Sequence, residues 1–211
     1  MNGIGYFRHQ EGRIGDVAVR AARLSYVGEA GWELSCAAGD AETLFAALAG
    51  EGVVPVGAFA QTAMRIEKGF LAYGYDLDTD VTPQMAGLEF ALAKNKDFIG
   101  KAALEKADKR SRTFGMRVRG GIAERGRTIS IGGDIVGRVC SSTWSPYQEC
   151  GVALVRMDNP ELGPGTEVVV TGTDGANYSA QLCSSPMYDA KGAIARGRNT
   201  EVPDGPEPWR G

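Results

Sequence analysis

The chain has 211 residues, of which 43% are hydrophobic, and a formal net charge of −3. This length and apolar content are sufficient for a folded protein with a hydrophobic core. The lysines and arginines are scattered rather than gathered into a basic stripe, which argues against nucleic-acid or anionic-membrane binding and favours a small-molecule partner. No apolar run is as long as a membrane-spanning helix, which needs about 18 residues. The first residues lack the basic-then-apolar order of a signal peptide, so we expect a cytoplasmic protein.

Cysteine and histidine usage narrows the chemistry further. The four cysteines lie far apart without a C-x-x-C pair, which predicts buried reduced thiols rather than a zinc or redox site. The only histidine in the sequence, His9, lies near the terminus, in a segment that we expect to be mobile. This argues against a Ser-His-Asp triad and against most zinc sites built within this chain. Chemistry must therefore use carboxylates, tyrosines, arginines or an outside partner.

The first third of the chain favours β-structure. Short strands are predicted for residues 4–8 and 13–24, around a turn at Glu11 and Gly12. A second hairpin follows, in which residues 28–31 form a four-residue loop because Gly28 and Gly31 permit positive φ angles.

In that hairpin Tyr26 lies opposite Glu33. Directly opposed residues of an antiparallel pair share one face, with their Cβ atoms about 5 Å apart. The sequence therefore predicts an aromatic hydroxyl beside a carboxylate.

Two helices are predicted next, at residues 41–49 after an Asp40 N-cap and at residues 58–68 before Gly69. Gln61 and Arg65 are four residues apart in the second helix and share a face. Its candidate buried positions are Phe59, Ala63, Met64 and Ile66.

Residues 70–87 predict a long ordered connection, with an acidic cluster at Asp76, Asp78 and Asp80 that we expect to be solvated or to border a pocket mouth. A third helix is predicted at residues 102–108. Beyond residue 113, short β-rich pieces separated by turn residues predict an antiparallel barrel or jelly roll.

The predicted fold class is therefore α+β, with an antiparallel hairpin-plus-helices segment in front of a C-terminal antiparallel β-barrel or jelly-roll-like domain. We place the first segment at residues 1–105, a charged linker at 106–112, the barrel at 113–191 and an extended tail at 192–211.

Several spaced motifs carry a family resemblance. Residues 25–34 read SYVGEAGWEL, residues 64–69 read MRIEKG, and residues 73–77 and 82–88 read YGYDL and TPQMAGL. Two more motifs follow in the same chain order: KDFIG at residues 96–100, and the spaced residues Gly137, Ser141, Ser145 and Pro146. From about residue 6 to about residue 190, the chain resembles the C-terminal half of the tetrahydrofolate-dependent aminomethyltransferase family, the glycine cleavage T-proteins. The motifs at residues 32–34 and 66–69 resemble the dimethylglycine and sarcosine dehydrogenase branch more than the glycine-cleavage branch.

The resemblance implies that residues 1–105 are the C-terminal part of a folate-binding domain. It places Tyr26 and Glu33 in the folate pocket, with Glu33 accepting hydrogen bonds from the pterin edge and Tyr26 against the ring. Arg65 and Gln61 are further candidates for folate contact, although a buried ion pair is the favoured interpretation of Arg65 and Glu67. Glycine-cleavage members carry an arginine where this chain has Gln61, which favours the demethylating branch.

The family's catalytic aspartate lies in an N-terminal half that has no counterpart in this sequence, so we assign no catalytic residue. The expected partners are folate, a small amine donor, and a separate N-terminal half or flavoprotein domain. The expected reaction transfers a one-carbon unit from an aminomethyl or N-methyl donor to tetrahydrofolate. A non-catalytic folate-binding or scaffold module, and a fragment of a folate-dependent O- or S-demethylase, remain open alternatives.

Overall fold

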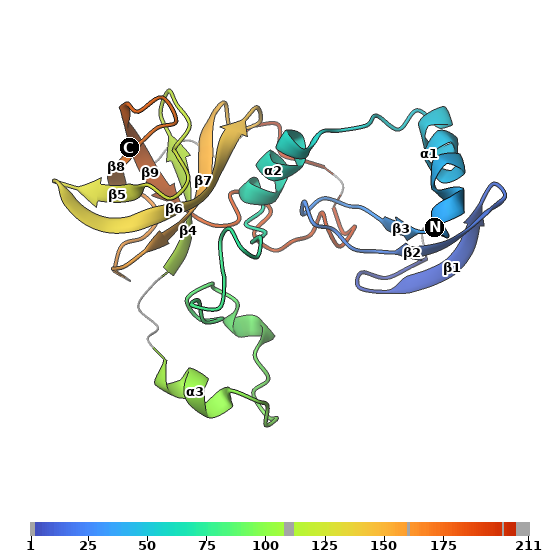
Figure 1. Ribbon diagram of the computed structural model, residues 1–211, viewed down its shortest axis with the longest axis horizontal. Helices are drawn as coiled ribbons and strands as arrows, with labels where there is room; N and C mark the ends of the chain where they lie inside the picture. Colours follow the sequence, from blue (N-terminus) through green and yellow to red (C-terminus); the bar gives the residue numbers. More distant parts are fainter. Residues whose placement is uncertain (1–2, 108–111, 160, 200, 206–211) are drawn as a thin grey trace.

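The computed structural model describes residues 3–107, 112–159, 161–199 and 201–205, and it confirms the α+β fold class. A three-stranded antiparallel sheet and two helices come first, and a closed six-stranded barrel follows. The sheet and the barrel lie at opposite ends of the molecule, with helix α2 between them (Figure 1).

The small sheet contains strands β1 (His9–Ile14), β2 (Val17–Ala22) and β3 (Glu33–Ser35), in that order. Alternation along β2 buries Val17, Val19 and Ala21 on one face. The turn predicted at Glu11 and Gly12 is wrong, because those residues pair within the ladder and the chain reverses at Gly15, whose φ is 53°. Glycine adopts this left-handed angle without a steric penalty.

The register predicted for the second hairpin is also wrong. Glu33 pairs with Ala22 rather than with Tyr26, so the connection runs from residue 23 to residue 32. Contacts outside the sheet explain this longer loop, since Glu29 is held by Tyr188 and Lys68 from other parts of the chain. Local turn preference cannot anticipate such tertiary contacts.

Helices α1 (Ala41–Gly50) and α2 (Ala58–Glu67) lie where they were predicted, after the short 3-10 helix η1 (Ala38–Asp40). Asp40 occupies the N-cap position without a side-chain capping bond, and Gly69 follows α2 with a φ of 67°. Ala63 and Ile66 are buried as expected, whereas Phe59 is 87% exposed. The buried face of α2 packs on β6 and β7.

The barrel is made of β4 (Arg112–Val118), β5 (Thr128–Ile131), β6 (Asp134–Ser145), β7 (Cys150–Met157), β8 (Glu167–Thr171) and β9 (Asn177–Cys183). Its closed order is β4-β7-β6-β5-β8-β9. Every residue of β7 is buried, because Ala153, Val155 and Met157 fill the barrel while Val152 and Leu154 cluster with Ile66 of α2. The barrel wall is thereby fixed to α2.

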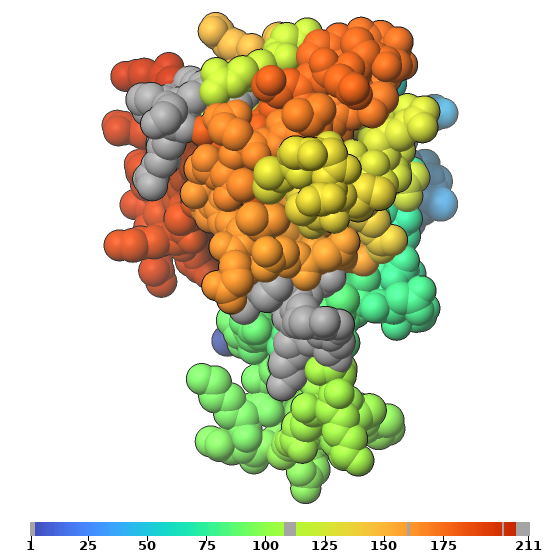
Figure 2. All heavy atoms as spheres, turned by 90° about the vertical axis from the view of Figure 1, so that its left-hand side faces the viewer, coloured from blue at the N-terminus to red at the C-terminus, as the bar shows by residue number. Residues whose placement is uncertain are grey.

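The segment between α2 and the barrel contains η2 (Glu89–Ala91) and α3 (Lys101–Lys106). It extends away from the barrel in Figures 1 and 2. The helix predicted to reach residue 108 ends at Lys106. Most of the predicted linker, residues 108–111, lies outside the described residues, so the boundaries of the predicted domains stay predictions.

The tail predicted to be extended from residue 192 begins differently. Residues 193–197 form turns, and Ile194 and Ala195 are buried. Asp189 accepts hydrogen bonds from the amides of Ala193 and Ile194, which stabilises this compact shape. Residues 200 and 206–211 of the predicted tail lie outside the described residues.

Candidate functional site

A hollow of about 290 Å³ lies where the 23–32 loop, α2 and the barrel meet. We call it the central hollow. Its lining residues are Tyr26, Gln61, Thr62, Arg65, Ala72, Tyr75, Arg125, Ser141 and Ser142. Three of the four residues predicted as folate contacts, Tyr26, Gln61 and Arg65, are therefore brought together.

Arg65 is buried at the base of this hollow. One guanidinium nitrogen, Nη1, lies 2.5 Å from Asp76 Oδ2, and the other, Nη2, donates a 2.7 Å hydrogen bond to Ser141 Oγ. The ion pair predicted for Arg65 is present, but its partner is Asp76 rather than Glu67. A buried pair of this kind neutralises the arginine and fixes its orientation.

Asp76 departs from the solvated acidic cluster that was expected. Its exposed fraction is 1%, whereas Asp78 and Asp80 are exposed. Oδ2 also accepts a 2.8 Å hydrogen bond from the Ala72 amide, and the Asp76 carbonyl accepts a 2.5 Å bond from Arg156 of the barrel. Asp76 thus connects α2, the following connection and the barrel behind the central hollow.

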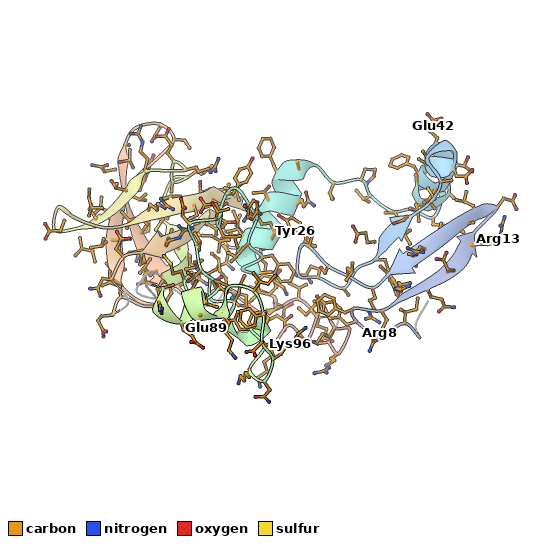
Figure 3. All side chains as sticks on the ribbon, turned by 60° about the horizontal axis from the view of Figure 1, so that its bottom comes forward. Arg8, Arg13, Tyr26, Glu42, Glu89 and Lys96 are labelled. Atoms are coloured by element: carbon orange, nitrogen blue, oxygen red, sulfur yellow. The ribbon has the colours of Figure 1, made fainter. Side chains whose placement is uncertain are left out.

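Tyr26 is half exposed and lies beside α2 (Figure 3). It lines the central hollow and also a larger, mainly apolar groove of about 630 Å³. The apolar groove includes Phe7, Phe70, Leu77, Leu88 and Phe90. Tyr26 therefore borders both the central hollow and the apolar groove.

The loop that carries Tyr26 is held by contacts with Lys68. A Cβ added to Gly28 would lie 2.5 Å from Lys68 Cβ, so only glycine allows this approach. The buried Lys68 ammonium lies 3.4 Å from Glu29 Oε1 and 3.2 Å from Asp189 Oδ2. Tyr188 donates a 2.6 Å hydrogen bond to Glu29, which completes the link between the loop and the segment after the barrel.

Glu67 lies near this group of charges and is also buried. Burial raises the pKa of its carboxyl, a hydrogen bond from Ser145 Oγ lowers it, and the charge of Glu29 raises it further. Burial and the bond to Glu29 likewise raise the pKa of Tyr188, which keeps this hydroxyl protonated as a donor. Glu67 connects α2 to β6 through Ser145, Tyr188 holds the loop through Glu29, and neither residue lines the central hollow.

Glu33 lies on β3 at the edge of the small sheet, exposed to solvent, and lines neither the central hollow nor the apolar groove. Its predicted place beside Tyr26 followed from the wrong register. Sequence reasoning also missed Tyr75, Arg125 and Ser142 as lining residues. Ser141 and Ser145 are part of one of the motifs that carry the family resemblance. Their contacts with Arg65 and Glu67 could not be predicted from the sequence, because these contacts depend on tertiary packing.

Within the described ranges, no cluster of three or more His, Cys, Asp or Glu side chains is arranged to hold a metal ion. None of the helices in the described part of the chain is long and apolar enough to span a bilayer.

Comparison with known proteins gives two family matches that follow the architecture. Residues 1–96 match the GCVT N-terminal domain, and residues 109–189 match the glycine cleavage T-protein C-terminal barrel domain. The chain belongs to the glycine cleavage T-protein, or aminomethyltransferase, family.

Individual relatives agree with this assignment. The aminomethyltransferase of Thermus thermophilus is 37% identical over 152 residues, which are 72% of this chain and 44% of the relative. Mouse mitochondrial dimethylglycine dehydrogenase is 34% identical over 214 residues, covering 92% of this chain and 24% of the relative. The crystal structure of glycine cleavage system aminomethyltransferase T from Bartonella henselae superposes with a TM-score of 0.79 at 25% identity, over 88% of this chain and 53% of that one. The chain thus spans about half the length of the aminomethyltransferases that it matches.

Proposed function

We propose that this chain forms the folate-binding part of a tetrahydrofolate-dependent aminomethyltransferase or N-demethylating enzyme. The observation that carries the proposal is that Tyr26, Gln61 and Arg65, three of the four residues that the family resemblance offers as folate contacts, line one hollow. Family membership supplies the expected ligand, and the cytoplasmic location expected from the sequence stays part of the proposal.

The side chains around Tyr26 fit a reduced folate chemically. A pterin has a flat π surface and a polar edge of donors, so it needs an aromatic wall and adjacent polar groups. Tyr26 supplies the aromatic surface between the two hollows, while Gln61, Thr62 and Ser142 supply amide and hydroxyl groups. In this proposal Tyr26 packs against the ring and Gln61 hydrogen-bonds to it.

Glu33 keeps its proposed role as an acceptor for the pterin edge under one condition. It lies on the edge strand β3 and outside both hollows, so the small sheet must move toward α2 when the pocket is completed. Arg65 is already paired with Asp76, so its proposed folate contact is made by a guanidinium whose charge is offset by that carboxylate.

The proposed reaction moves a one-carbon unit from an aminomethyl or N-methyl donor to tetrahydrofolate. In this proposal the catalytic carboxylate comes from a part of the family fold that this chain does not span, since the chain covers about half the length of its aminomethyltransferase relatives. Similarity to a dimethylglycine dehydrogenase and the glutamine at position 61 support the N-methyl donor.

Calorimetric titration of the purified chain with tetrahydrofolate tests the binding claim. Because this proposal assigns part of the folate pocket to a region that the chain does not span, we expect tetrahydrofolate to bind weakly, in the millimolar range. The Tyr26→Ala variant should bind it more weakly still. Absence of heat at millimolar ligand contradicts the proposal. Tight micromolar binding without turnover favours the alternative, a free-standing folate-binding module.

A transfer assay tests the catalytic claim. The chain alone is expected to transfer no formaldehyde-level carbon from an N-methyl donor to tetrahydrofolate. Turnover by the chain alone at a rate near that of full-length relatives contradicts our assignment of catalysis to the other half. Turnover with an O- or S-methyl donor favours the demethylase alternative.

A further inference from the structure

The charges around the central hollow are not balanced. Two arginines, Arg65 and Arg125, line it, and none of the described lining residues is acidic. The charge of Arg65 is offset by Asp76, which lies 2.5 Å behind it. Arg125 has no carboxylate within ion-pair distance among the described residues, so the hollow retains one positive charge.

Arg125 is held in place without being neutralised. Its Nε donates a 3.2 Å hydrogen bond to the Cys140 carbonyl, and Nη2 donates a 3.0 Å bond to the Gly74 carbonyl. Its guanidinium carbon lies 4.1 Å from the centroid of the Tyr75 ring. Two carbonyls and an aromatic face orient the cation, so little side-chain entropy remains to be lost when an anion binds.

Hydroxyl groups line the same hollow as this cation. Thr62, Tyr26 and Tyr75 line the hollow with Ser141 and Ser142 from β6. Ser142 donates its hydroxyl proton to the Ala123 carbonyl, and Ser141 accepts from Arg65, so both serines are fixed. A positive charge among hydroxyl donors favours a carboxylate, since charge-assisted hydrogen bonds are the stronger ones.

We infer that Arg125 forms a carboxylate-binding subsite in the central hollow. The subsite takes the carboxylate of a small organic acid, with Arg125 as its charged donor and Thr62 and Tyr26 as hydroxyl donors. Only the source of the carboxylate rests on the proposed function: because the pterin is proposed to pack against Tyr26 and the glutamate lies at the other end of folate, the carboxylate belongs to an amino-acid donor of the one-carbon unit.

Nuclear magnetic resonance of the ¹⁵N-labelled full chain tests the subsite with simple probes. Acetate and the isosteric neutral acetamide are titrated separately. We expect acetate to shift signals of residues 61–65, 125 and 141–142 in a saturable way and acetamide to leave them unchanged. Equal responses to acetate and acetamide overturn the inference.

A matched pair of variants assigns the effect to one residue. Arg125→Gln should weaken acetate binding about tenfold, as expected on losing a charge-assisted hydrogen bond. Arg127→Gln removes the same charge two residues away, where Arg127 pairs with Glu124 on the exposed surface, and should leave acetate binding within about twofold. Equal weakening by the two variants overturns the inference. Arg125→Lys should bind with intermediate affinity, which separates loss of charge from loss of fold.

Competition tests the source of the carboxylate. N,N-Dimethylglycine is titrated with and without saturating tetrahydrofolate. We expect it to bind alongside tetrahydrofolate, whereas its displacement by tetrahydrofolate would show that folate itself occupies the subsite and would overturn the assignment to the donor. If acetate binds through Arg125 and tetrahydrofolate does not bind at all, the subsite stands and the proposed function fails.

Discussion

The barrel and the small N-terminal sheet differ in how completely each can bury its own core. The barrel closes all its strand edges around twelve buried core residues, whereas the sheet relies on three, Val17, Val19 and Leu44. On α1 and the connection after it, Phe45 and Val54 remain exposed. A domain with so little core needs support from outside it.

That support comes partly from the charged contacts of the 23–32 loop. Glu29, Lys68, Tyr188 and Asp189 connect this loop to α2 and to the segment after the barrel. The central hollow is therefore formed by one self-sufficient part, the barrel with α2, and one dependent part, the loop that carries Tyr26. Changes in the barrel should act on stability, and changes in the loop on the shape of the hollow.

The largest expected effect is in the barrel core. Leu182→Ala removes a fully buried side chain and should lower the free energy of unfolding by about 4 kcal/mol. Leu44→Ala on α1, which packs against Val17 and Val19 of the small sheet, should cost only about 2 kcal/mol, because this small cluster can collapse into the space. Urea unfolding followed by circular dichroism measures both, and equal losses would break the comparison.

The ion pair behind the hollow comes next. Asp76→Ala leaves the Arg65 guanidinium buried without its counter-charge and should cost about 3 kcal/mol. The double variant Arg65→Met, Asp76→Leu removes both charges and should be more stable than Asp76→Ala alone. If the double variant is less stable than Asp76→Ala, the claim that Asp76 stabilises the fold by offsetting the buried charge of Arg65 is wrong.

The loop attachment should show a smaller effect. Gly28→Ala introduces a Cβ 2.5 Å from Lys68 Cβ at a φ of 78° and should cost about 2 kcal/mol, with faster hydrogen exchange in residues 23–32. Gly52→Ala is the control, since its φ is 81° but nothing lies within 4 Å of the added atom. That control should cost about 1 kcal/mol from backbone strain alone. Equal costs would mean that contact with Lys68 does not position the loop.

The smallest effect is a pH dependence from Glu67. Burial raises its folded-state pKa above the unfolded value, so the folded state binds the extra proton between those two values. Its contribution to stability is therefore fully present below the unfolded pKa and is lost as the pH rises through the folded pKa. Glu67→Gln should remove this slope and gain on the order of 1 kcal/mol at neutral pH, since one pKa unit corresponds to about 1.4 kcal/mol. Unfolding curves from pH 4 to 8 check this, and an unchanged slope would contradict it.

Local sequence signals predicted the parts of this molecule that depend on local structure. Gly69 predicted the C-terminal end of α2. The i, i+4 spacing of Gln61 and Arg65 predicted that they lie on the same side of that helix, and both line the hollow. The barrel followed from short strands separated by turn residues. These features need no knowledge of distant contacts.

The errors at the candidate site involve residues whose positions depend on distant parts of the chain. Tyr26 and Glu33 were paired by a tight turn that the contacts of Glu29 with Lys68 and Tyr188 prevent. Asp76 looked like a solvated acid, yet it is buried against Arg65 and Arg156. Arg125 reaches the hollow only because the barrel folds back on the connection after α2.

The central claim is that folate binds at the hollow beside Tyr26. Chemical-shift mapping of the ¹⁵N-labelled chain with tetrahydrofolate tests this most directly. We expect saturable shifts around Tyr26, Gln61 and Arg65 that vanish in Tyr26→Ala. No shift at millimolar ligand, or shifts confined to the far side of the barrel around Ile131 and Ile135, would contradict it.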